Sequence, residues 1–366
     1  MKVLTLIFVA LSSLPTLLHA AAKQTAKNKI DFLFYSAPNP INWKTPTTLV
    51  RTTIKNYLAI VDPKALESLM QFSPETENSS KSAQETDMDR QFSQVFALLE
   101  NEKRGGGAGI VTYPHGISHV NVRLQCEGSE EILLGMTGEE PNSYYLRKLL
   151  FEGGSMETIA ENTRGRFFTK DEVNQWLPYM KSSGMMHQLS YLISNQNCNQ
   201  IQKYLVAYKD FKQNLIYGGL GTEPLSGVGA GCSAFAMSVM KVAGLYEQTF
   251  EHHFTRSLRI SNKMFNFPGN KAEVDVYDIL WDNDLTWASE NEPHQIIHFW
   301  DPQLMYDWTK AVGMGTLKWY QNYKVTKDQN SITIEVNAEK IPTPKTFVHK
   351  PQHIEKIKAE VNRLWN

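Results

Sequence analysis

A glycine-rich segment that leads into an apolar segment places the strongest constraint on how this chain can fold. Gly227, Gly229 and Gly231 alternate with small residues, and Cys232 begins a mostly apolar run that ends at Gly244. Glycine weakens regular structure and lets a backbone approach its neighbours closely, whereas the residues that follow have the spacing of a buried helix. The sequence therefore predicts a loop that delivers the Cys232 thiol to the first turn of a buried helix.

A thiol at a helix start has two interpretations. Backbone N–H groups and the positive end of the helix dipole favour a thiolate there, and the same N–H groups could hold the oxyanion that forms when it attacks a carbonyl. On the predicted helix, however, Phe235, Ala236 and Val239 share the face of Cys232. Free cysteine is among the most buried residue types, so the thiol could simply be the first small residue of a buried stripe.

The first twenty residues predict an exported protein. They contain one lysine, Lys2, then the apolar stretch 3–18, and they end in Leu18-His-Ala20 before two further alanines, which is the layout of a cleavable secretory signal. No later run is long and apolar enough to span a bilayer. A formal net charge of −1 lacks the basic excess of a nucleic-acid binder. We expect a periplasmic or secreted protein that does not bind nucleic acid.

The chain has three cysteines, and in an exported protein they cannot all pair with one another. Cys126 and Cys198 have neither a glycine-rich lead nor a helix start that would activate a thiol. We therefore predict that these two form a disulfide and that Cys232 stays free. The alternative is that all three are reduced residues of the core.

Three segments before residue 140 have the character of strands. Lys29–Tyr35 is a short apolar run, Ile117–Cys126 alternates regularly, and Glu130–Met136 could pair with it across a turn. In the alternating segment, one face carries Val120, Val122 and Leu124, and the other carries His119, Asn121, Arg123 and Gln125. A strand can fix an imidazole firmly, so His119 is the best-placed candidate base.

The remaining pattern predicts three parts after the signal at 1–20. Residues 28–140 form a strand-rich half, 141–217 an all-helical insertion, and 218–366 the cysteine helix with a C-terminal α+β part. In the second part, helices are predicted at 143–151, 170–180, 187–194 and 199–215. In the third, we predict a strand at 272–280, a helix at 302–312, an antiparallel pair at 316–326 and 331–337, and a closing helix at 351–365.

Three motifs together resemble a known superfamily. Asp31-Phe-Leu-Phe-Tyr35, then Gly116-Ile-Ser-His119-Val-Asn-Val-Arg-Leu124, and the later Gly231-Cys232-Ser233 helix look like the core of the NlpC-type papain-like proteins. The histidine precedes the cysteine here, as in the circularly permuted branch, which includes lecithin:retinol acyltransferase-like and YiiX-like proteins. The resemblance implies an α+β fold in which an antiparallel sheet packs on the cysteine-bearing helix.

The resemblance also implies roles for particular residues. Cys232 matches the nucleophile and His119 the general base, while Asn121 replaces the usual glycine and could orient the ring or line the oxyanion site. The third polar residue has no clear match, so Glu131 or Thr137 could only substitute from nearby. The implied activity is that of a hydrolase or acyltransferase that opens an amide or ester bond in a cell-wall peptide or acyl-lipid substrate. It needs no cofactor and no metal.

Two other classes of function remain open. His294-Gln-Ile-Ile-His298 would place two imidazoles at the zinc-peptidase spacing on one helix face, although Gln295 stands where a glutamate would act as general base. The other class is a non-catalytic binding or structural protein of the envelope that keeps a degenerate papain-like fold. The missing third polar residue favours this second alternative.

Overall fold

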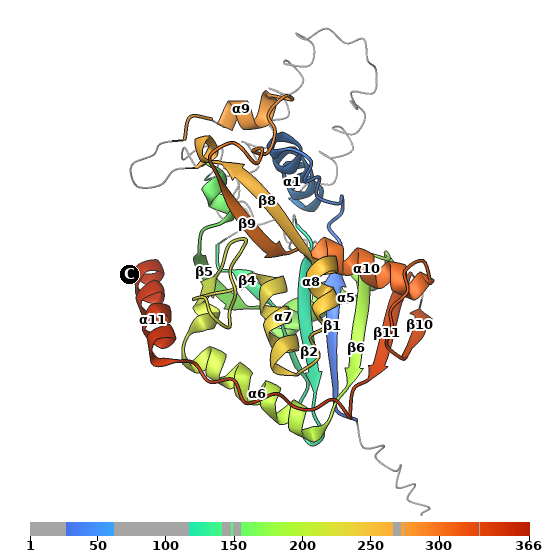
Figure 1. Ribbon diagram of the computed structural model, residues 1–366. Coiled ribbons are helices and arrows are strands. Elements are labelled where there is room, and N and C mark those ends of the chain that lie inside the picture. Colours follow the sequence, from blue (N-terminus) through green and yellow to red (C-terminus); the bar gives the residue numbers. More distant parts are fainter. Residues whose placement is uncertain are drawn as a thin grey trace, which may run out of the picture.

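A mixed six-stranded sheet forms the centre of the computed structural model, which describes residues 27–61, 117–140, 148, 155–265, 272–274, 276–328 and 330–366 (Figure 1). The strands are β1 (Lys29–Tyr35), β2 (His119–Gln125), β3 (Ile132–Leu134), β6 (Met186–Leu192), β10 (Tyr323–Asp328) and β11 (Ser331–Asn337). Their order is β10-β11-β6-β1-β2-β3, and of these pairs only β11 and β6 run parallel. The fold is therefore α+β, and its sheet draws strands from all three predicted parts of the chain.

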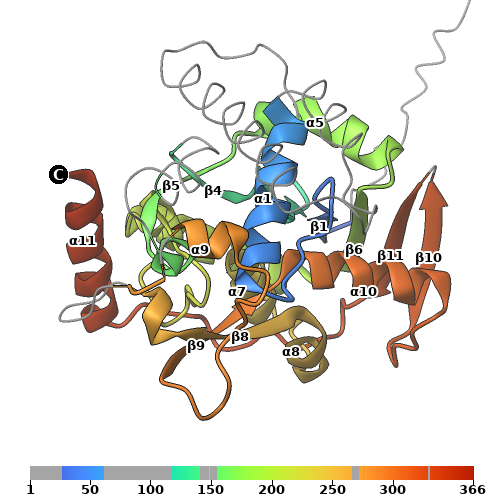
Figure 2. The ribbon, with the colours of Figure 1, turned by 90° about the horizontal axis from the view of Figure 1, so that it is seen from above.

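Helices cover the two sides of this sheet differently (Figure 2). We call one side the α7 face, because α7 (Cys232–Val242) packs there with α6 (Asn195–Asp210) and α10 (Pro302–Met314). We call the other the α5 face, because α5 (Lys170–Ser182) packs there. The α7 face carries Phe32, Phe34, Val120, Val122, Leu124, Leu189, Tyr191, Ile334 and Val336. The alternate strand residues, which include Leu33, Tyr35 and His119, point to the α5 face.

Two smaller units lie beside the central sheet. Strands β4 (Met136–Gly138), β5 (Thr163–Phe167) and β7 (Ile216–Tyr217) form a small sheet, and the closing helix α11 (Pro351–Trp365) packs on it. Strands β8 (Thr255–Ser261) and β9 (His294–Trp300) form a two-stranded antiparallel sheet. It shares a separate apolar cluster with α1 (Pro46–Val61) and α9 (Val276–Trp281). Helix α8 (Gln248–Phe254) connects α7 to this two-stranded sheet.

The predicted disulfide is confirmed. Cys126, directly after β2, is bonded to Cys198 in the first turn of α6, with 5.9 Å between their Cα atoms. Both residues belong to the apolar cluster of the α7 face. Cys232 is the free cysteine, as predicted.

Several other predicted elements are confirmed. The strand at 29–35 and the helices that begin at Pro302 and Pro351 are present. The antiparallel pair is also present, but its first strand covers 323–328 and not 316–326. A proline at the first helical position and, for α10, the Asp301 side chain that accepts a hydrogen bond from the Gln303 amide explain why these helix starts can be recognised locally.

Other predictions are wrong. Residues 187–192, within the helix predicted at 187–194, lie in β6, and residues 276–280, within the strand predicted at 272–280, lie in α9. Segment 141–217 is not an all-helical insertion, because it contains β5, β6 and β7. β6 lies between β1 and β11, so partners distant in sequence decide its conformation. The signal at 1–20 and, apart from Lys148, the predicted helix at 143–151 lie outside the described residues.

No helix in the described part of the chain is both long and apolar enough to cross a bilayer.

Candidate active site around Cys232

Cys232 is the first residue of α7, as the sequence predicts, and only 4% of it is exposed. Gly231 caps the helix through its backbone alone. The sulfur is hydrogen-bonded by the backbone of Val120 in β2, by the backbone of Ser233 and by the side chain of Tyr217 in β7. The thiol therefore lies against strand β2, near the small sheet.

The surroundings of Cys232 favour the neutral thiol. Burial raises the pKa of the Cys232 thiol to about 11, and the hydrogen bonds from Val120, Ser233 and Tyr217 offset only part of that rise. The positive end of a helix normally lowers the pKa of a cysteine. Here desolvation is the larger effect, because a buried charge costs more than these donors return. The expected thiolate is not the stable form at neutral pH.

Packing accounts for two of the three glycines that precede Cys232. A Cβ on Gly229 would lie 2.4 Å from the Ile216 side chain, and one on Gly227 would lie 2.7 Å from the Glu223 carbonyl oxygen. The Gly227 carbonyl oxygen also accepts a hydrogen bond from His353 Nε2 in α11. Gly227 and Gly229 thus let the loop pack closely between β7 and the C-terminal helix, a role that requires no ligand.

His119 is completely buried at the start of β2. Its ring packs edge-on against Phe168, with 5.4 Å between ring centroids, and stacks on Tyr35 at 6.3 Å. His119 Nε2 is 2.9 Å from Asn121 Oδ1. Since an amide oxygen only accepts hydrogen bonds, this nitrogen carries the hydrogen. Burial lowers the pKa of His119 to about 3, although the hydrogen bond to Asn121 opposes the shift, so the ring is neutral.

The structure does not bring Cys232 and His119 together. The sulfur contacts the backbone of Val120, whose side chain belongs to the α7 face. Adjacent residues of a strand point to opposite sides of a sheet, and the ring of His119 accordingly lies on the α5 face, against Phe168. The β2 backbone separates the two side chains. The two side chains therefore approach β2 from different sides, whereas a nucleophile and its general base act within hydrogen-bond reach of each other.

Asn121 and Glu131 lie on the same side as His119 or at the edge of the sheet. Asn121 is completely buried and holds the His119 ring, the orienting role that the resemblance implies, but it does so on the α5 face. A Cβ on Gly135 would fall 1.8 Å from Asn121 Oδ1, so glycine is required where β3 leads into β4. Glu131 forms an ion pair with Lys170, 3.3 Å away at the start of α5. Thr137 lies in β4, opposite Arg166.

The alternative of a metal site at His294 and His298 depends on a helix, and the structure has a strand there. His294 and His298 lie in strand β9, not on a helix, so they are separated by four strand steps of roughly 3.3 Å each. That distance is too long for two ligands of one ion. His298 Nδ1 instead lies 2.6 Å from Ser257 Oγ. Among the described residues, no group of three or more His, Cys, Asp or Glu side chains could hold a metal ion.

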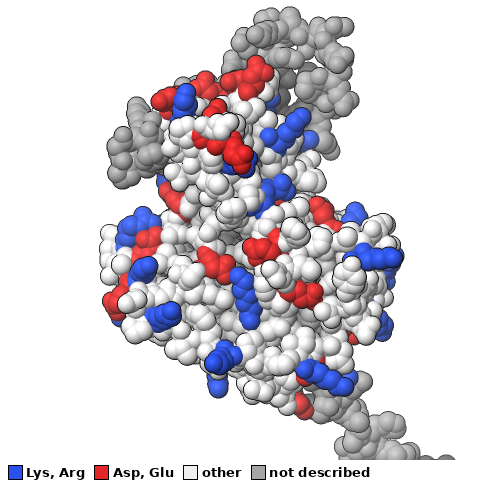
Figure 3. All heavy atoms as spheres, viewed as in Figure 1, with Lys and Arg blue, Asp and Glu red and all other residues white. Residues whose placement is uncertain are grey.

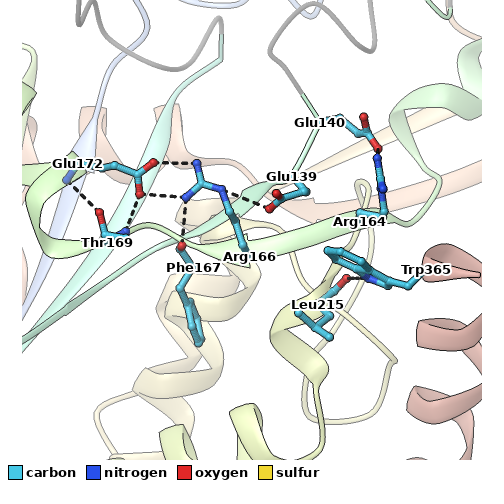
Figure 4. A network of polar contacts seen from close by, with 9 residues as sticks. All are labelled: Glu139, Glu140, Arg164, Arg166, Phe167, Thr169, Glu172, Leu215 and Trp365. Atoms are coloured by element: carbon cyan, nitrogen blue, oxygen red, sulfur yellow. Dashed lines mark hydrogen bonds and ion pairs between the residues drawn. The ribbon is translucent and has the colours of Figure 1, made fainter.

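A polar network around β5 was not predicted from the sequence (Figure 4). Arg166 donates to both carboxylate oxygens of Glu172, at 2.8 and 2.9 Å, and also pairs with Glu139. Glu172 and Thr169 form a capping box at the start of α5. The spacing Thr169-x-x-Glu172 is the sequence signal for this capping box, at the start of the helix that is predicted at 170–180. The network fastens the small sheet to α5.

Comparisons with protein-family models, with curated proteins and with solved structures found no match.

Proposed function

We propose that this chain is an exported, non-catalytic binding or structural protein of the cell envelope, built on a degenerate papain-like framework. One observation carries this proposal: Cys232 and His119 lie on opposite sides of β2. The bond between Cys126 and Cys198 supports export, since disulfides persist in oxidising compartments. The motifs that resemble the papain-like proteins then reflect a shared framework of sheet and helix.

The protonation states also support a non-catalytic role. A thiol nucleophile needs an imidazole within roughly 3 Å and works through a thiolate. Here the pKa of Cys232 rises to about 11 while the pKa of His119 falls to about 3. These shifts oppose both ions of a thiolate–imidazolium pair. At neutral pH only roughly one thiol in ten thousand would be ionised.

A second candidate is the hydrolase or acyltransferase that the resemblance implies, acting on a cell-wall peptide or acyl-lipid substrate. The backbone hydrogen bonds of Val120 and Ser233 to the sulfur favour it, because the same N–H groups could hold an oxyanion. This candidate needs a proton acceptor other than His119. It also needs a rearrangement that exposes Cys232.

The rate at which iodoacetamide labels Cys232 tests the proposal. We expect labelling at pH 7.5 to be at least a hundredfold slower in the native protein than in denaturant, and Cys232→Ser identifies the labelled site. His119→Ala removes a buried ring, so it leaves the rate unchanged or raises it through partial unfolding. Fast native labelling that slows in His119→Ala would establish the enzyme instead.

A further inference from the structure

Four lysines without an ion pair lie in strand β10 or in the segment before it, toward one edge of the central sheet. Residues 308–327 contain four lysines and neither aspartate nor glutamate. These lysines are Lys310, Lys318, Lys324 and Lys327, and all four are exposed. None forms an ion pair with another residue in the described part of the chain, whereas the adjacent Asp328 is already paired with Lys181 at 2.5 Å. We call these four residues the lysine cluster.

Strand β10 is one of the two edge strands of the central sheet in the described part of the chain. Among the described strands it pairs only with β11, so half of its backbone N–H and C=O groups face outward. Four of its six residues are exposed, and it forms the outer margin of the sheet in Figure 1. Lys324 and Lys327 point to opposite sides of this edge, since they are three strand residues apart. Charged side chains on an edge prevent a second copy of the same strand from pairing with it.

The loop that leads into β10 is fixed, so its exposed side chains are held outward. Trp319 packs against Trp308, with 5.0 Å between ring centroids, and its Nε1 donates to Glu247 Oε2 at 3.0 Å. Its neighbour Tyr320 is 97% exposed, and Met314 at the end of α10 is 56% exposed. The space-filling view shows charged side chains scattered in both signs over most of the visible face (Figure 3). Lysines without an ion pair, exposed apolar side chains and an open strand edge thus occur together at this margin.

We infer that the β10 edge binds an extended acidic peptide segment, which joins the central sheet as an additional strand. Outward backbone groups recognise an extended backbone through main-chain hydrogen bonds. The lysine cluster selects carboxylates on that strand, and the same charges repel another copy of β10. Tyr320 and Met314 supply apolar contact next to the charges. This inference deepens the proposed non-catalytic role by naming a class of partner, and it rests on that role.

The probe is a ten-residue peptide in which pairs of Glu alternate with pairs of Val or Thr, so that both faces of the extended strand carry carboxylates. It is labelled with fluorescein and titrated by anisotropy at low salt. We expect saturable binding that Lys324→Glu combined with Lys327→Glu weakens at least tenfold. The matched control combines Lys340→Glu with Lys345→Glu, which makes the same charge change at two exposed lysines outside the cluster. The control should bind like the wild type. Amide hydrogen exchange in residues 323–328 should slow when the peptide is bound.

Three results would overturn the inference: no binding of the acidic peptide, equal weakening in both double variants, or binding without slower exchange in β10. Binding to phosphatidylglycerol vesicles through the lysine cluster, with no response to the peptide, would assign the surface to lipid and also overturn it. Thiol labelling of Cys232 is measured separately on the same preparations. Failure of the peptide experiment is thereby distinguished from failure of the proposed non-catalytic role.

Discussion

The two faces of the central sheet are built on different physical principles. On the α7 face, apolar strand residues and three helices form one large apolar cluster, and the disulfide between Cys126 and Cys198 is part of it. The α5 face has a smaller apolar cluster and a set of buried polar side chains. Cys232 belongs to the first side and His119 to the second. Each therefore takes its protonation state from a different environment.

Four polar residues of the α5 face are hydrogen-bonded to one another. Arg123 Nε donates to Asp31 Oδ2 at 2.8 Å, Ser190 Oγ donates to Asp31 Oδ1 at 2.6 Å, and Gln188 Nε2 donates to Ser190 Oγ at 2.7 Å. Buried polar groups are normally paired in this way. His119 and its partner Asn121 continue this set along β2. A buried histidine on a strand can therefore be part of a structural polar face and need not act on a nearby thiol.

The largest expected effect concerns the α7 face. The disulfide spans 72 residues, and loss of a cross-link of that length should lower the free energy of unfolding by about 4 kcal/mol. The variant with Cys126→Ala and Cys198→Ala, unfolded in urea, measures this loss. A change below about 1 kcal/mol would show that the α7 face does not depend on the cross-link.

The next effect concerns the α5 face. Gly135→Ala would place a Cβ 1.8 Å from Asn121 Oδ1 and 3.0 Å from His119 Nε2. We expect a loss of about 3 kcal/mol in the free energy of unfolding, because the buried pair must move. The matched control is Gly138→Ala, whose Cβ would meet no atom closer than 3.8 Å. Equal stability of the two variants would remove Asn121 and His119 from this packed arrangement.

A buried histidine on each face makes the stability of the protein depend on pH. The folded-state pKa of His119, about 3, lies below its ordinary value of 6.5, so its contribution is present above pH 6.5 and is lost as pH falls. Between pH 8 and pH 5 the loss should be about 2 kcal/mol. Urea unfolding of His119→Gln should show a correspondingly smaller pH dependence. His187→Gln provides the comparison on the α7 face, where burial lowers the pKa of His187 to about 4.

The smallest effect concerns the partly exposed polar network around β5. Arg166→Ala removes the contacts with Glu172 and Glu139. Exposed ion pairs contribute little, so we expect a loss of about 1 kcal/mol or less, and less still at high salt. Urea unfolding at two salt concentrations measures it. A loss as large as that of Gly135→Ala would mean that the network, rather than the buried pair, holds the α5 face.

Local signals predicted much of the fold. The alternation in 119–125 and the Pro-led helix starts at 302 and 351 depend on residues close in sequence, and each of these elements is present. Strand β6 was missed because its conformation depends on β1 and β11, which are distant in sequence. The local pattern in segment 141–217 predicts helices, but at β6 the pairing with the central sheet decides the conformation.

The candidate site could be predicted only in part. The helix start at Cys232 and the disulfide followed from glycine spacing and cysteine number, and both are present. The alternation of β2 is also present, and it decides which side of the sheet each candidate site residue faces. An apolar helix packs its apolar face on apolar neighbours, so α7 belongs with Val120 and Val122. His119 alternates with these valines along β2, so its side chain lies on the other side of the sheet.

Titration of the His119 ring by NMR tests most directly whether the two faces are independent. The imidazole signals of His119 should remain those of a neutral ring down to about pH 4, consistent with a pKa of about 3, and Cys232→Ser should leave the curve unchanged. A His119 pKa above 6 that shifts when Cys232 is replaced would contradict the account, because it would show that the imidazole and the thiol interact.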